Sequence, residues 1–116
     1  MSKRHFGGLA AEDIAARHYE AAGSFVLAKR WKCPEGEIDV ICQEGDVLVF
    51  VEVKLRRDHQ AAAHAISAKQ WQRVAAAAQA YISAEGLGLD TDMRFDAALV
   101  DGTGALEVIE NAAMFE

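Results

Sequence analysis

The sequence predicts a single α/β domain over residues 1–116, with helices packed on a mixed central β-sheet in the order αβββαββ. Two observations support this class. The chain has 116 residues, of which 52% are hydrophobic and only one is proline, so it can bury an ordinary core and is not expected to be disordered. Short runs rich in apolar and β-branched residues occur together with two longer segments of helical period, which indicates both strands and helices.

The two helices are expected at residues 9–22 and 68–84. The first is rich in alanine and is followed by Gly23, a residue typical of helix C-termini. Its apolar side is expected to consist of Ile14, Ala15, His18, Tyr19, Ala21 and Ala22, with Glu12 at the edge. The second helix follows Ser67, which fits a capping box with Gln70. Its apolar stripe is expected to consist of Trp71, Val74, Ala78, Tyr81 and Ile82.

Five strands are expected, at residues 24–31, 37–43, 47–54, 93–100 and 105–109. The second and third are joined by QEGD, a sequence that suits a tight hairpin turn. The two turn residues are either Glu44 and Gly45 or Gly45 and Asp46. The third strand is apolar on both faces at its start, which predicts that it is buried there and polar only at its other end.

The composition indicates a cytoplasmic protein that does not enter a membrane. No apolar run reaches the roughly 20 residues that cross a bilayer, and acids interrupt the N-terminal segment where a signal peptide would be apolar. Cys33 and Cys42 lack the spacing of a metal site, so we expect reduced thiols. The four histidines form no recognisable ligand pair, so zinc is not expected.

The net charge of −6 is unevenly spread. Up to residue 73 the chain has eleven Lys and Arg against ten Asp and Glu, and after it one Arg against eight acids. An acidic total does not by itself suggest a nucleic-acid partner. However, a metal ion held by the site acids would leave the first part of the chain clearly basic.

Four charged side chains occupy one end of the predicted hairpin. Because side chains alternate along a strand, Glu37 and Asp39 share one face of the hairpin with Glu52 and Lys54. The turn that begins at Gly45 sets Asp39 opposite Glu52, and the other turn sets Glu37 there. Facing carboxylates repel unless something neutralises them, and Mg²⁺ prefers such oxygen ligands. The pattern therefore predicts a Mg²⁺ or Mn²⁺ site beside Lys54, which could stabilise charge developing on a phosphate. The alternative is a solvated and inert hairpin end.

Basic residues flank this end of the hairpin in the sequence. The candidates for contacts with nucleic-acid phosphates are Arg30, Lys32, Arg56, Arg57, Lys69 and Arg73. Lys69 and Arg73 lie one turn apart on one side of the second helix. For each candidate the alternative is a solvated surface cation.

The segments GEID at residues 36–39 and FVEVKLR at residues 50–56 resemble the bacterial YraN-like family of the PD-(D/E)xK nuclease superfamily. The likeness covers nearly the whole chain and includes GGLAAEDIAARHYEAAG, AKQWQRVAAAAQAYI and RFDAALV. It implies a restriction-endonuclease-like core similar to that of the Holliday-junction resolvases. The chain departs from its relatives in KRWKCPE, which lacks the asparagine that often precedes GEID, and in its end, ENAAMFE.

The resemblance also implies roles for individual residues. Asp39, Glu52 and the carbonyl of Val53 would form the metal site, with Lys54 as the catalytic lysine. Glu12 would be an additional acid carried by the first helix, and Glu37 matches the GEID motif.

The implied function is hydrolysis of phosphodiester bonds by a Mg²⁺- or Mn²⁺-dependent endonuclease that acts on DNA, with branched or structured DNA among the candidate substrates. Resolvase-like action needs two active sites and hence a homodimer. The alternatives are a catalytically weak nucleic-acid-binding module and a protein-interaction domain. The acidic C-terminal part of the chain favours the last.

Overall fold

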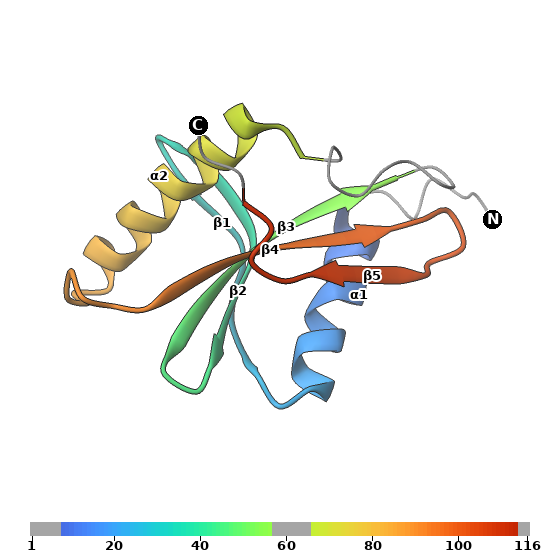
Figure 1. Cartoon of the computed structure of the whole chain (residues 1–116), viewed down its shortest axis with the longest axis horizontal. Helices are drawn as coiled ribbons and strands as arrows, with labels where there is room; N and C mark the ends of the chain where they lie inside the picture. The colour runs from blue at the N-terminus through green and yellow to red at the C-terminus, as the bar shows by residue number, and fades with distance from the viewer. Residues whose placement is uncertain (1–7, 57–65, 114–116) are drawn as a thin grey trace.

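The computed structural model describes residues 8–56 and 66–113, which form two helices and a five-stranded mixed sheet (Figure 1). The elements, in chain order, are α1 (Gly8–Ala21), β1 (Phe25–Cys33), β2 (Gly36–Glu44), β3 (Val47–Leu55), α2 (Ala68–Ala84), β4 (Met93–Val100) and β5 (Leu106–Ile109). The predicted mixed α/β class is confirmed. Within the described residues, neither helix is long and apolar enough to cross a membrane.

The sheet has the strand order β1-β2-β3-β4-β5. Neighbouring strands are antiparallel except β3 and β4, which are parallel. Parallel neighbours need a long crossover connection, and α2 lies in the segment that joins these two strands. β3 therefore lies inside the sheet, and its site residues remain paired with β4 beyond the end of its pairing with β2.

The hairpin turn between β2 and β3 consists of Gly45 and Asp46. Glu44 pairs with Val47, which leaves these two residues as the turn. Gly45 has a φ of 58°, a conformation that glycine adopts without strain at the first position of a tight hairpin turn. Of the two turns that the sequence allows, this is the one expected to set Asp39 opposite Glu52, although the pairing of β2 with β3 ends one residue earlier, at Val40 and Val51.

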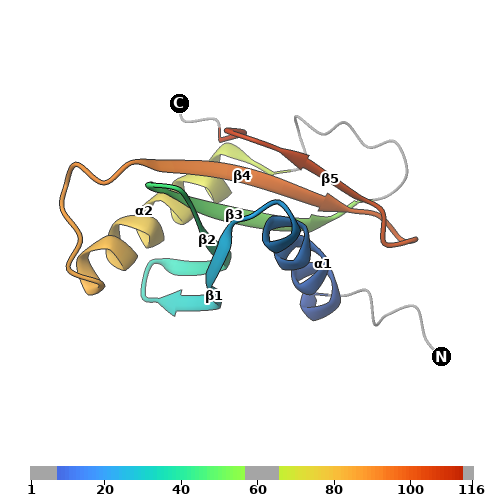
Figure 2. The same ribbon diagram turned by 90° about the horizontal axis from the view of Figure 1, so that it is seen from below.

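Each helix covers one face of the sheet. On β3, Leu48 and Phe50 pack in the cluster under α2, whereas Val49 and Val51 pack in the cluster under α1. The start of β3 is thus buried on both faces, as predicted. The two helices lie apart from each other in both views (Figures 1 and 2).

The buried face of α1 differs from the prediction. Tyr19 and Ala15 are buried as expected, but His18, Ala21 and Ala22 are exposed. The buried side chains of this helix are Ala11, Glu12, Ala15, Ala16 and Tyr19. Alanines occur on several sides of α1, so its sequence does not define one apolar stripe, and contact with the sheet decides which side is buried.

Candidate metal and active site

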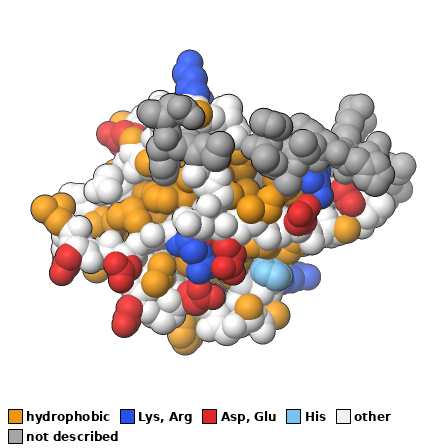
Figure 3. Space-filling view, in the orientation of Figure 1, with side chains coloured by type: hydrophobic (Ala, Val, Ile, Leu, Met, Phe, Trp, Pro, Cys, Tyr) orange, Lys and Arg blue, Asp and Glu red, His pale blue; other side chains and the backbone are white. Residues whose placement is uncertain are grey.

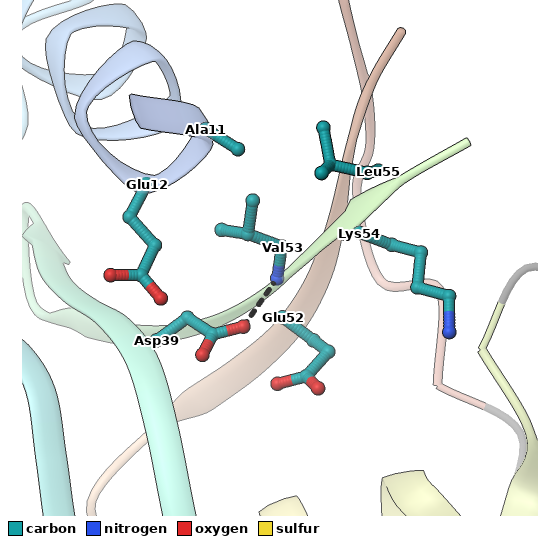
Figure 4. Close-up of a pocket in the computed structure, with 7 residues that line it drawn as sticks. All are labelled: Ala11, Glu12, Asp39, Glu52, Val53, Lys54 and Leu55. Carbon is teal, nitrogen blue, oxygen red and sulfur yellow. Dashed lines mark hydrogen bonds between the residues drawn. The ribbon is translucent and has the colours of Figure 1, made fainter. Parts of the chain in front are cut away.

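The candidate site lies where β2 and β3 separate. Their backbone pairing ends at Val40 and Val51. Beyond this pair, the N–H of Val53 donates to Oδ2 of Asp39 at 2.8 Å, so a side chain replaces the next β2 carbonyl in the ladder (Figure 4). The N–H and C=O of one strand residue point toward the same neighbour. The Val53 carbonyl therefore faces the same opening as Asp39.

A break in the strand alternation accompanies this opening. Ile38 and Ile41 both pack in the cluster under α2 although they are three residues apart, while Val40 packs under α1. The irregularity thus lies at Asp39. On β1, Arg30 lies opposite Asp39 in the register and has a left-handed φ of 54°. The kinked strand pair turns Asp39 out of the regular pleat and toward the opening.

Four carboxylates from three elements meet at this opening. Glu12 of α1 and Glu37 and Asp39 of β2 have carboxylate oxygens within 4.8 Å of one another. Glu52 of β3 lies on the other side of Asp39, and both carboxyls are within hydrogen-bonding reach of each other. A pocket of about 380 Å³ opens beside them (Figure 4). Its lining consists of Ala11, Glu12, Asp39, Glu52, Val53, Lys54 and Leu55.

Burial makes this group of acids electrostatically unfavourable without a cation. Glu12 and Glu52 are each only 6% exposed. Burial, and then the negative charge of Asp39, raise the pKa of Glu52 to about 8 and that of Glu12 to about 7. Burial also raises the pKa of Asp39. These acids hold protons near neutral pH unless positive charge compensates them.

Glu52 is held by a residue that the sequence did not assign to the site. The side-chain amide of Gln70, on α2, donates a hydrogen bond to Oε2 of Glu52. Ser67 caps α2 as predicted, accepting the Gln70 N–H at 3.1 Å, but the Gln70 side chain serves Glu52 instead of completing the capping box. No sequence signal could have shown this contact, because it depends on where α2 crosses the sheet.

The second carboxylate oxygen of Glu52, Oε1, indicates whether the residues of the site suit a metal ion. Oε1 is buried and has no hydrogen-bond partner among the described residues. A buried carboxylate oxygen without a partner is costly. The neighbouring candidate metal ligands are carboxylate oxygens and one backbone carbonyl oxygen, which Mg²⁺ and Mn²⁺ prefer. The residues present therefore fit a hard divalent cation.

Lys54 shares a strand face with Glu52 and borders the same pocket. Its side chain is partly exposed and extends away from Glu12 and Asp39, beyond Glu52 (Figure 4). Within the described part of the chain, its ammonium has neither a hydrogen bond nor an ion pair. The lysine is free to meet a ligand at the pocket mouth.

The predicted phosphate-contacting residues have different surroundings. Arg73 of α2 is exposed and borders a second hollow beside Glu37, Asp39 and Glu52. Lys69 and Lys32 are exposed.

Two other candidates are paired with acids. Arg56 forms an ion pair with Glu107 of β5. Arg30 lies beside Glu12 and Glu37. Arg57 lies outside the described residues.

The fold and the site together define a class: a mixed α/β protein with a pocket of convergent carboxylates at the fork of its sheet. The chain belongs to the family described as "Uncharacterised protein family UPF0102", whose model matches residues 11–100. This confirms the YraN-like family that the sequence predicted.

Several relatives share this family over nearly their whole length. A UPF0102 protein of Ruegeria pomeroyi is 48% identical over 111 residues, which cover 96% of this chain and 90% of the relative. A UPF0102 protein of Cereibacter sphaeroides is 46% identical, with 93% of this chain and 92% of the relative covered. A UPF0102 protein of Azorhizobium caulinodans is 40% identical, with 97% and 86% covered.

Proposed function

We propose that the protein is a Mg²⁺- or Mn²⁺-dependent endonuclease that hydrolyses phosphodiester bonds in DNA. The observation that carries this proposal is the buried carboxylate pocket, in which Glu52 keeps one oxygen without a partner among the described residues. Buried acids lower stability unless a cation compensates them. A protein that only binds nucleic acid or another protein gains nothing from this arrangement.

The chain's own residues have separate tasks in this proposal. Asp39, Glu52 and the Val53 carbonyl would hold the cation, which when bound would neutralise phosphate charge as a Lewis acid and help to activate a water. Gln70 holds Glu52 in the orientation that leaves Oε1 available. Lys54, at the pocket mouth, would stabilise negative charge that develops on the phosphate during the reaction.

The likeness to the PD-(D/E)xK superfamily supports DNA as the substrate and a restriction-endonuclease-like core. Exposed Lys69 and Arg73 on α2 add positive charge on the side of the opening formed by this helix. Branched or structured DNA is the substrate class that we infer from the likeness to resolvases. Cleavage of both strands of such DNA would need a homodimer.

A cleavage assay tests the proposal. We expect the wild-type protein to cut at least one of linear, flapped and four-way DNA when Mg²⁺ or Mn²⁺ is present, and none of them in EDTA. Lys54→Ala should abolish cleavage while DNA binding, measured by fluorescence anisotropy, changes little, because this lysine acts on charge that develops during the reaction. Calorimetry should show that Lys54→Ala still binds Mn²⁺.

Two outcomes would contradict the proposal. If no DNA substrate is cut with either ion, the protein is not a DNA endonuclease, and the two binding alternatives become the better explanations. If Lys54→Ala cuts at the wild-type rate, Lys54 has no part in the mechanism.

A further inference from the structure

Arg30 has an unusual backbone conformation for a strand residue. Its φ of 54° lies in the left-handed region, a backbone conformation that residues other than glycine and asparagine seldom adopt. Such a conformation has an energetic cost and persists only where the surrounding structure imposes it. It occurs in the middle of β1, opposite Asp39 of the candidate site.

The side chain of Arg30 lies against the acids of that site. Nη1 is 3.7 Å from Oε1 of Glu12, and Nε is 3.8 Å from Oε2 of Glu37. The guanidinium therefore places its positive charge beside two of the three carboxylates that converge within 4.8 Å. Its charge also opposes the rise in the pKa of Glu12. Arg30 acts as the counter-ion of this carboxylate group.

This ion pairing is weak compared with others in the molecule. Lys29, the preceding residue, lies 3.0 Å from Asp13 in a direct hydrogen bond. Arg30 contacts its two acids only at longer distances, and its side chain is 40% exposed. Ion pairs of this kind contribute little to stability. A divalent cation, which carries more charge in a smaller volume, can displace the guanidinium from these carboxylates.

We propose that Arg30 is a phosphate-binding residue controlled by the metal: it neutralises Glu12 and Glu37 until a divalent cation does so, and then binds the phosphodiester. This inference rests on the proposed function. The planar guanidinium suits bidentate contacts with phosphate oxygens, and the residue lies at the exposed rim of the carboxylate group. Arg30 therefore competes with the metal ion for the carboxylates and, once released, helps to bind the substrate phosphate.

The first experiment measures the competition, by calorimetry with Mn²⁺ alone and no DNA. Arg30→Asn is the informative variant because asparagine tolerates the left-handed conformation. With the competing charge removed, Mn²⁺ should bind roughly three- to tenfold more tightly than to the wild type. Lys29→Ala is the matched control, since it removes one positive charge from the neighbouring position of β1 and should leave Mn²⁺ affinity almost unchanged.

The second experiment measures binding of a short DNA duplex by fluorescence anisotropy, in Ca²⁺ and in EDTA, with gel analysis to verify that the DNA stays intact. Arg30→Asn should weaken binding in Ca²⁺, where the wild-type guanidinium is released, and reduce the slope of log affinity against log salt by roughly 0.9. In EDTA the variant should bind as the wild type does. In the calorimetric experiment, Arg30→Lys keeps the positive charge and should therefore retain most of the competition with Mn²⁺.

The outcomes separate this inference from the proposed function. Tighter Mn²⁺ binding by Arg30→Asn together with DNA binding that weakens only in Ca²⁺ supports the inference, even if no substrate is cleaved. Unchanged or weaker Mn²⁺ binding by Arg30→Asn overturns it, as does equal weakening of DNA binding in Ca²⁺ and EDTA. Either of these results leaves a wild-type nuclease activity standing. A wild-type protein that binds no divalent cation overturns the inference as well.

Discussion

Glu52 and Glu12 lie where the protein excludes water, so a charge on either carboxyl is poorly solvated. Asp39 adds a third negative charge between them. The folded chain therefore holds protons on Glu12 and Glu52 up to pKa values of about 7 and about 8, whereas these groups normally titrate near 4.5. The difference links the stability of the metal-free protein to pH.

The first prediction at this scale concerns that pH dependence. Between pH 4.5 and pH 8 the unfolded chain loses both protons, while the folded chain keeps that of Glu12 until about pH 7 and that of Glu52 until about pH 8. Because the folded state then binds more protons, the free energy of unfolding contributed by these groups should decrease as pH rises through this range and level off above it. Urea unfolding of the metal-free protein at a series of pH values measures the change.

Two comparisons identify the groups responsible. Glu52→Gln should stabilise the metal-free protein at pH 8 by roughly 1–3 kcal/mol, because it removes a buried charge and keeps the side-chain volume. The variant should also show a smaller decrease in the free energy of unfolding as pH rises. Saturating Mg²⁺ should raise the stability of the wild type most at high pH, since the ligands must be deprotonated. Stability that rises from pH 5 to pH 8 without metal would contradict the assignment.

At the scale of elements, α1 is joined to the sheet by a second polar group that is distinct from the carboxylate pocket. Asp96 of β4 is fully buried and accepts a hydrogen bond from the Tyr19 hydroxyl of α1 at 2.6 Å. Arg94 donates to both oxygens of Asp96, and the N–H of Asn111 donates to Oδ1. This group is fully hydrogen-bonded, so we interpret it as structural.

The prediction for this element is a loss of stability in Tyr19→Phe. The variant removes one hydrogen bond to a buried carboxylate, which should cost about 1–3 kcal/mol of unfolding free energy. Because α1 carries Glu12, we also expect weaker Mn²⁺ binding. Denaturant unfolding and calorimetry measure the two effects. His18→Ala, at the exposed neighbouring position, should change stability by less than about 0.5 kcal/mol.

On the scale of the whole molecule, three exposed acids lie far from the candidate site. The carboxylate site lies at the C-terminal end of β3, whereas the connection between α2 and β4 lies near the other end of the sheet (Figure 1). That connection carries exposed Glu85, Asp90 and Asp92, and Figure 3 shows acidic side chains there without Lys or Arg beside them. These three acids therefore lie away from the candidate site, whereas Asp101 and Glu107 lie at its end of the sheet, near Arg56.

The positions of these charges relative to the site predict which substitutions affect DNA binding. The double variant Lys69→Ala/Arg73→Ala should weaken binding in Ca²⁺ and reduce the slope of log affinity against log salt by about two. The comparison variant, Glu85→Gln/Asp90→Asn, changes the net charge by the same amount in the opposite direction and at the far end, and should not weaken binding. Anisotropy titrations at several salt concentrations test both. An unchanged slope for the first variant would favour the protein-interaction alternative.

The sequence alone determined the class of fold, the helices and strands to within two residues at each end, and the acids that meet at the site. These features follow from local rules: periodicity along a segment, alternation along a strand and the preferences of turn residues. The short turn and the register of the hairpin placed Asp39 near Glu52, although the alternation itself breaks at Asp39. The local rules left open which two residues form the turn.

Tertiary structure decided what local rules do not contain. The side of α1 that is buried, the hydrogen bond from Gln70 to Glu52 and the position of Arg30 beside Glu12 all join residues from different elements. The break in alternation at Asp39 is accompanied by a left-handed residue, Arg30, on the neighbouring strand, and arginine does not signal that conformation. Periodicity describes one segment at a time, whereas these contacts depend on how the packed segments meet.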